Sequence, residues 1–135
     1  MNRVQETQKL QSYAETVWEV AAEIFPALVK FDCPQIVLNG RYTRVAGMSF
    51  YMLNKIDISL KYYIFHKKQV INTILVHELA HQITYNLYGD KAMKAENGHG
   101  IEWQFVMLKL GQTPNRFHEL SIPNMKLSEM LELVK

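Results

Sequence analysis

The sequence of 135 residues contains a single cysteine, Cys33. One cysteine can neither form an internal disulfide nor supply a cluster of thiolate ligands for zinc, and this scarcity favours a reducing compartment. Long apolar runs are also missing, because no stretch reaches the roughly 18 consecutive apolar residues of a membrane span. The polar N-terminus lacks the pattern of a signal peptide. We therefore expect a cytoplasmic protein that does not enter a membrane.

Net charge is small, at +2, but it is unevenly distributed. The stretch that begins with Arg41 and ends with Lys68 contains six basic residues and one acidic residue, Asp57. Such a basic stretch is compatible with a polyanionic partner such as DNA. Solvated basic side chains on strand edges and loops explain it at least as well, so both interpretations stay open.

Repeats, low-complexity runs and linker-like segments are absent too, while 48% hydrophobic and 21% charged residues are typical of a globular protein. Residues 1–135 are therefore expected to form a single domain. From Val4 to about Val29, apolar residues recur at helical spacing. This pattern predicts one long helix, or two helices joined near Pro26.

Short runs of β-type residues follow at 36–38, 45–53 and 56–60, with turn signals at Asn39-Gly40 and Asn54-Lys55. The alternation in the third run predicts a strand with one buried face, and the three runs together predict an antiparallel meander. Helical spacing returns at 67–87 and 99–110, and a short helix is expected at 126–134. A helix, a small sheet and two further helices make an α+β fold.

Residues 77–81 read His77-Glu78-Leu79-Ala80-His81, which matches H-E-x-x-H inside a predicted helix. One helical turn separates the two histidines, so both imidazoles project from one face, and neutral imidazole is a good zinc ligand. Zinc lowers the pKa of a bound water to about 7, and Glu78 is placed to take the proton and pass it to the departing amine. The motif predicts a zinc-dependent peptidase with His77 and His81 as ligands and Glu78 as general base.

A catalytic zinc usually takes three protein ligands and leaves one position open. The downstream candidates are Glu96, His99 and Glu102. A metzincin would need glycine and histidine where the sequence has Thr84 and Leu87, so that class is excluded. His99 is favoured because two flanking glycines allow its backbone to pack against the first helix, and Glu102 remains the rival.

The run from His99 to Trp103, HGIEW, follows the HELAH helix at a spacing that resembles the SprT-like metalloprotease family, which includes the Spartan proteases. The resemblance covers roughly residues 36–118. It implies a zincin-like domain in which Zn²⁺ is held by His77, His81 and His99. Many members also carry a four-cysteine zinc ribbon, which this sequence lacks, so we expect a minimal catalytic domain.

The expected function is a zinc endopeptidase that binds extended polypeptide along an edge strand of the sheet. DNA-associated proteins are a candidate substrate class, which the resemblance and the basic stretch suggest. The alternative is a DNA-associated binding module in which zinc is structural and protease activity is weak or absent. Zinc-dependent hydrolysis of a non-peptide bond has no support beyond the shared metal.

Other residues near the motif receive a structural interpretation first. Trp103 is expected to pack behind the zinc site, and His66 to cap a helix or face solvent. A surface or core role is expected for His118, ahead of a hydrogen bond to substrate. Tyr85 and Tyr88 follow the zinc helix, and either can stabilise an oxyanion, so the sequence does not distinguish them.

Overall fold

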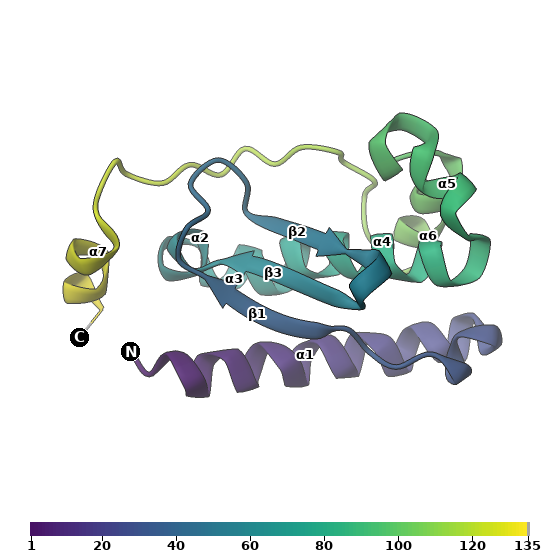
Figure 1. The fold of residues 1–135 in the computed structure, drawn as a ribbon, viewed down its shortest axis with the longest axis horizontal. Helices are drawn as coiled ribbons and strands as arrows, with labels where there is room; N and C mark the ends of the chain where they lie inside the picture. Colours follow the sequence, from purple (N-terminus) through teal and green to yellow (C-terminus); the bar gives the residue numbers. More distant parts are fainter. Residues whose placement is uncertain (135) are drawn as a thin grey trace.

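A computed structural model describes residues 1–134 and confirms an α+β fold with a three-stranded sheet (Figure 1). The elements in chain order are α1 (Arg3–Ile24), the 3-10 helix η1 (Pro26–Lys30), β1 (Gln35–Asn39), β2 (Gly47–Phe50), the 3-10 helix η2 (Tyr51–Leu53), β3 (Lys55–Ser59), α2 (Leu60–Phe65), α3 (Lys67–Gln69), the π-helical turn η3 (Val70–Ile74), α4 (Leu75–Tyr88), α5 (Asp90–Lys94), the 3-10 helix η4 (Ala95–Gly98), α6 (Ile101–Lys109) and α7 (Leu127–Leu133). Within these residues, no helix combines the length and the apolar character needed to cross a membrane.

The N-terminal helix forms as its apolar spacing predicts. The side chain of Asn2 caps its first turn by accepting a hydrogen bond from the backbone N–H of Gln5. Its buried face consists of Leu10, Ala14, Trp18 and Ala21, which lie on one side of the helix. The α-helix ends just before Pro26, and η1 follows, so the prediction of two helices joined near Pro26 is confirmed.

The sheet is mixed, so the predicted antiparallel meander is wrong in one of its two pairings. Its strand order is β1-β3-β2, and β3 pairs antiparallel with β2 but parallel with β1. The loop at residues 40–46 joins β1 to β2 across a gap that β3 fills. A meander would have required β1 and β2 to be hydrogen-bonded neighbours.

Burial of both faces of β3 explains this difference. The sequence predicted one buried face, yet Asp57 and Ser59 are buried as well as Ile56 and Ile58. The end of β1 and the loop that precedes β2 cover them: Asn39 and Tyr42 each donate a hydrogen bond of 3.0 Å to Oδ2 of Asp57, and Ser59 Oγ donates to the carbonyl of Tyr42. Polar residues in the third run therefore anchor a loop and do not face solvent.

The predicted helix at 67–87 exists, with a π-helical turn near its start. The segments α3, η3 and α4 follow one another without a break, and Gly89 ends α4 with a φ of 82°, which a glycine adopts without strain.

Three short helical elements after β3 were not predicted. The third β-type run ends in α2, which Ser59 caps by accepting a hydrogen bond from the N–H of Tyr62, and the polar segment after Gly89 contains α5 and η4.

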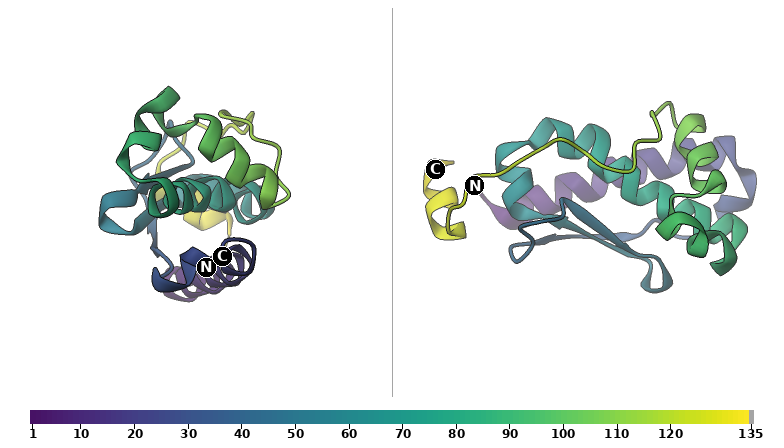
Figure 2. Two further views of the ribbon diagram at one scale, coloured as in Figure 1. Left: turned by 90° about the vertical axis from the view of Figure 1, so that its right-hand side faces the viewer. Right: turned by 90° about the horizontal axis from the view of Figure 1, so that it is seen from above.

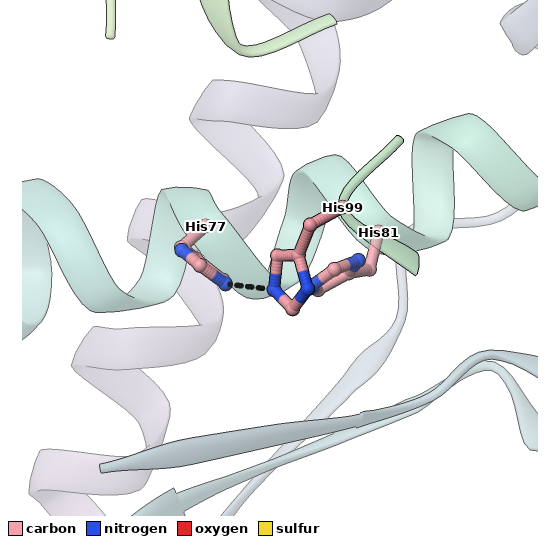
Figure 3. A group of neighbouring side chains, drawn as sticks. All are labelled: His77, His81 and His99. Atoms are coloured by element: carbon pink, nitrogen blue, oxygen red, sulfur yellow. Dashed lines mark hydrogen bonds between the residues drawn. The ribbon is translucent and has the colours of Figure 1, made fainter. Parts of the chain in front are cut away.

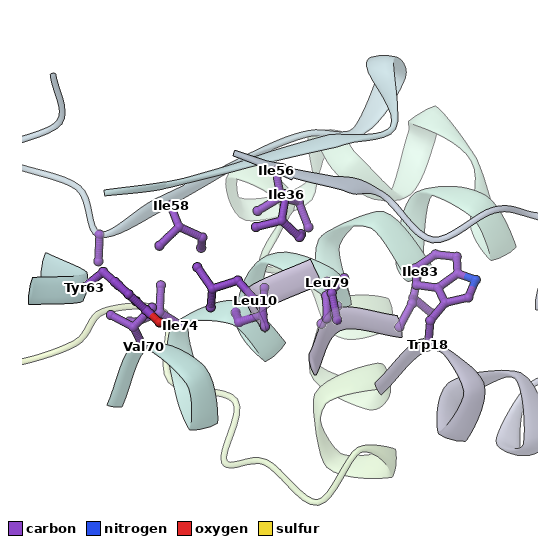
Figure 4. Packing of buried hydrophobic residues seen from close by; sticks show 14 of the residues in the cluster. Leu10, Trp18, Ile36, Ile56, Ile58, Tyr63, Val70, Ile74, Leu79 and Ile83 are labelled. Atoms are coloured by element: carbon purple, nitrogen blue, oxygen red, sulfur yellow. The ribbon is translucent and has the colours of Figure 1, made fainter. Parts of the chain in front are cut away.

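The core lies between the sheet, α1 and α4, as Figure 4 shows. Isoleucines of β1 and β3 meet Leu10 of α1 and Leu79 of α4 there. The helix α6 packs on another side of α4, so α4 is enclosed by β2, α1 and α6 (Figure 2). At the far end of the chain, α7 packs near α2 and buries Met130.

We expect replacement of Asp57 by alanine to lower the free energy of unfolding by about 3 kcal/mol. Two buried hydrogen bonds to a carboxylate would be lost, each worth roughly 1.5 kcal/mol or more, and two donors would be left unpaired. Urea unfolding followed by circular dichroism measures this change. The Tyr42→Phe variant removes only one of the two donors and should cost about half as much; equal losses would contradict the shared role of the carboxylate.

Candidate metal centre

Three histidines from two parts of the chain meet at one point (Figure 3). His77 and His81 project from the same face of α4, and His99 reaches them from the turn before α6. One ligand atom from each ring lies within 4.8 Å of the other two. The Nε2 atoms of His77 and His99 are 3.2 Å apart. Two nitrogens on one tetrahedral zinc are about 3.3 Å apart, so this geometry fits that ion.

A tight reversal of the backbone delivers His99 to this point. Three successive residues, Glu96, Asn97 and Gly98, have positive φ angles of 49°, 55° and 83°. A Cβ atom on Gly98 would lie 3.3 Å from Nδ1 of His81, so the glycine allows the turn to sit against that ring. The close contact of Gly98 with α4 agrees with the prediction that glycines beside His99 let the backbone pack against that helix.

The rival carboxylates do not join the histidines. The carbonyl oxygen of Glu96 lies 3.3 Å from Nδ1 of His99, which leaves Nε2 to face His77. The side chain of Glu102 lines a separate small hollow with Tyr88 and Lys91. Among residues 1–134, the only group of three or more metal-ligating side chains that could hold an ion is the histidine cluster.

Trp103 forms the back wall of the cluster. Its side chain is 1% exposed and stacks on His81 at an interplanar angle of 18°, with ring centroids 5.4 Å apart. Its centroid lies 4.8 Å from that of His77 and 4.7 Å from that of His99. This confirms that Trp103 packs behind the histidines, where it restricts the orientation of all three rings.

Burial keeps the histidines neutral. It lowers the pKa of His77 to about 4 and that of His81 to about 3, and the nearby rings lower both pKa values further. The pKa of His99 is also lowered, mainly by burial. The Nδ1 atom of His81 is buried, and no atom of residues 1–134 forms a hydrogen bond with it. Neutral rings with available lone pairs are the form of histidine that binds a metal.

Glu78 lies between the histidines and the sheet. Its Oε2 atom is 3.9 Å from Nε2 of His77, and the residue is 8% exposed. Burial raises the pKa of its carboxyl to about 8, and the backbone N–H of Ser49 on β2 partly opposes that shift. A Cβ atom on Gly47 would stand 3.0 Å from Cγ of Glu78, so the strand approaches the carboxylate closely.

The cluster faces a cleft of about 1510 Å³. One wall comes from β2 and the loop before it, including Arg44 and Ser49, and the other comes from the connecting segment, residues 110–126, between α6 and α7. Of the tyrosines considered from the sequence, neither Tyr85 nor Tyr88 is among the cleft-lining residues, whereas Tyr51 and Tyr62 are. These two were missed because only the strand and helix packing brings them to the cleft.

Of the remaining two histidines, His66 contacts the connecting segment and His118 belongs to it. His66 stands between α2 and α3, and its backbone N–H ends α2, but its side chain caps neither helix: Nε2 lies 2.6 Å from the carbonyl oxygen of Ser121. His118 lines the cleft, and its ring packs edge-on against Tyr62.

We expect His99→Ala to weaken zinc binding by more than about 100-fold. Loss of an outer-shell partner of a metal ligand already costs roughly 10- to 100-fold, and loss of a ligand should cost more. Competition with a chromogenic chelator measures the affinity. Glu102→Gln is the matched control on the same turn of chain and should bind zinc as the wild type does; the opposite ranking would identify Glu102 as the third ligand.

Comparison with known proteins agrees with this geometry. The model of the SprT-like family matches residues 8–123. Curated relatives named Protein SprT include one from Vibrio atlanticus, 32% identical over 72% of this chain and 55% of its own length. Another, from Pseudomonas putida, is 26% identical over 85% of this chain and 66% of its own. A third, from Pseudomonas entomophila, is 28% identical over 84% of this chain and 65% of its own.

The chain thus spans little more than half to about two thirds of the length of these relatives. No solved structure matched it. The family match covers most of the sequence, including the helices and the turn that bring the three histidines together. The chain belongs to the SprT-like family.

Proposed function

We propose that this protein is a zinc-dependent endopeptidase. The observation that carries the proposal is the position of Glu78, whose carboxylate lies beside three convergent neutral histidines at the base of an open cleft. His77, His81 and His99 would hold the zinc ion. A bound zinc ion supplies Lewis acidity, which makes water acidic near neutral pH and polarises a carbonyl group.

The carboxylate of Glu78 would act as the base and then as the acid. It takes one proton from the attacking water as the oxygen of that water forms a bond to the scissile carbonyl carbon. When the carbon–nitrogen bond breaks, Glu78 returns the proton to the departing amine. The products are a carboxylic acid and an amine, and the enzyme ends in its starting protonation state. Burial raises the pKa of the Glu78 carboxyl, so its carboxylate is a stronger base for the proton of water than an exposed one.

The substrate would be an extended polypeptide. β2 lies at one side of the sheet, and its residues Gly47, Met48 and Ser49 line the cleft next to Glu78. A strand of substrate can pair with such an edge through backbone hydrogen bonds, which recognise chain conformation and not sequence. An open cleft with a strand for a wall fits an endopeptidase that accepts flexible segments of many proteins.

A DNA-associated binding module with structural zinc remains the second candidate, and DNA-associated proteins remain candidate substrates. Two of the six basic residues on which this idea depends are paired with acids: Lys55 with Asp57, and Lys67 with Glu6. Arg44, by contrast, lines the cleft. A cytoplasmic location would give the protein access to both nucleic acid and newly made polypeptide.

We expect Glu78→Gln to reduce cleavage of casein by about 10²- to 10⁴-fold, which is the usual contribution of a general base. The amide cannot accept the proton of water, while the three histidines are unchanged. Gel densitometry or a fluorogenic casein measures the rate, and metal analysis should still find zinc. Glu102→Gln controls for loss of a carboxylate nearby.

Equal rates of casein cleavage by the wild type and the Glu78→Gln variant would contradict the peptidase proposal. DNA affinity that falls steeply with salt, and survives in that variant, would then support the binding module.

A methyl group at position 47 should impair catalysis without removing the metal ligands. In Gly47→Ala, the new Cβ would stand 3.0 Å from Cγ of Glu78 and 3.2 and 3.3 Å from side-chain atoms of Ile74 and Ile58. Displacement of the carboxylate should lower kcat by about tenfold, while zinc affinity stays near that of the wild type. Steady-state kinetics on a fluorogenic peptide measures kcat. Gly40→Ala crowds Leu127, and because neither residue is among those that line the cleft, this variant is the control. Similar kcat values in both variants would exclude a specific effect on Glu78.

A further inference from the structure

The connecting segment brings a second set of polar groups to the cleft that contains the metal centre. It runs from α6 along the open side of the domain to α7, as Figures 1 and 2 show. The contact between His66 and the carbonyl of Ser121 fastens it to the end of α2. Packing of α7 near α2 holds its far end. The segment is therefore tied down on both sides of the part that lines the cleft, which includes His118.

The ring of His118 is held by contacts that leave one nitrogen available. Nδ1 accepts a hydrogen bond of 3.1 Å from the backbone N–H of Leu120. In a neutral imidazole, one nitrogen accepts and the other carries the proton, so this bond places the proton on Nε2. The ring also packs edge-on against buried Tyr62, at a centroid distance of 5.4 Å and an angle of 77°. His118 thus presents an N–H donor whose tautomer is fixed by the backbone.

That donor shares a cleft with the metal centre. His118 lines the same cleft as His77, His81 and His99. The backbone of Asn115, three residues earlier on the same segment, lies beside His77. Burial and the neighbouring His66 lower the pKa of His118 itself, which favours the neutral ring near pH 7. His118 is not a member of the ligand cluster.

Other donors that line the cleft are less well prepared. The guanidinium of Arg116 lies over the exposed ring of Phe117, 5.1 Å from its centroid, on the surface of the segment. The ring of Tyr51 packs against Tyr85 at 4.9 Å, but among residues 1–134 no hydrogen bond orients its hydroxyl. A donor stabilises a transition state best when it is fixed before the charge appears, because no reorganisation is then needed. Of these three donors, His118 meets this criterion best.

We propose that His118 is a catalytic residue whose Nε2–H donates a hydrogen bond to the scissile carbonyl oxygen as that oxygen gains negative charge. Tyr62 and the N–H of Leu120 are the positioning groups. No proton is transferred from His118 in this role, so the proton balance between water, Glu78 and the leaving amine is unchanged. The inference rests on the peptidase function proposed above and assigns to that site a donor outside the metal ligands.

Two substitutions distinguish the role of Nδ1 of His118 from the role of Nε2. The amide oxygen of His118→Asn can still accept from the N–H of Leu120, but its side chain is too short to supply the donor at Nε2. The amide nitrogen of His118→Gln can reach approximately that position. We expect His118→Asn to lower kcat by about 10²- to 10³-fold, the usual effect of removing one oxyanion donor, with KM changed less than about threefold. His118→Gln should recover at least about tenfold of that loss, and both variants should keep their zinc.

Two further readouts do not depend on turnover. Nitrogen-15 spectra of the metal-free protein should show His118 as the Nε2–H tautomer. Calorimetry of the zinc protein with a phosphinic peptide, whose anionic oxygen resembles the charged carbonyl oxygen, should show the same 10²- to 10³-fold loss of affinity in His118→Asn. His66→Gln loosens the segment but keeps the donor, and its kcat should stay within about tenfold of the wild type.

An Nδ1–H tautomer would overturn the assignment, as would a kcat of His118→Asn within threefold of the wild type. An equal loss in His66→Gln would show that His118 only holds the segment. If Glu78→Gln is inactive while His118→Asn is not, the peptidase proposal stands and only this inference fails. If the wild type neither cleaves polypeptide nor binds the phosphinic peptide, both fail together.

Discussion

The burial of α4 on several sides is the constraint on which the rest of the structure depends. The sheet, α1 and α6 all pack against this helix, so nine of its residues from Leu75 to Thr84 are buried, and they include Glu78 and His81. A helix with a single apolar face would have left these polar groups in water, where their pKa values would be ordinary. Enclosure instead keeps the histidines neutral and the carboxyl protonated at a higher pH. Burial of ionisable groups at this cost is typical of functional sites, because a bound cation can offset it.

The second half of the site depends on how the chain reverses after α4. Two successive non-glycine residues in the left-handed region, Glu96 and Asn97, are strained, and such strain persists only where surrounding contacts require it. Here the turn places His99 against His77, while Trp103, in the first turn of α6, closes the space behind all three rings. The HGIEW run is therefore a single packing unit: its histidine points to the metal position, and its tryptophan fixes the ring orientations.

Features of the fold and the site that depend on residues close together in the sequence could be predicted, whereas features that depend on residues far apart in the sequence could not. Local signals were sufficient for the long helices, for the end of α1 before Pro26 and for the approach of His99, because spacing, proline and glycine act within a few residues. The mixed sheet was missed because the position of β3 between β1 and β2 depends on contacts of Asp57 with residues 15 and 18 positions earlier. The same holds for Tyr62 and His118, whose place in the cleft results from packing between α2 and a segment about 55 residues later.

The mixed sheet also determines which strand borders the cleft. Because β3 is the central strand, its polar groups are used to hold the loop before β2, and β2 is left as the strand beside α4. In a meander of order β1-β2-β3, the strand next to Glu78 would have been paired on both edges, and no backbone groups would remain there for a substrate. The buried network around Asp57 and the open edge of β2 are thus two consequences of one topology. A mutation that weakens the network should therefore be felt at the cleft wall as well as in overall stability.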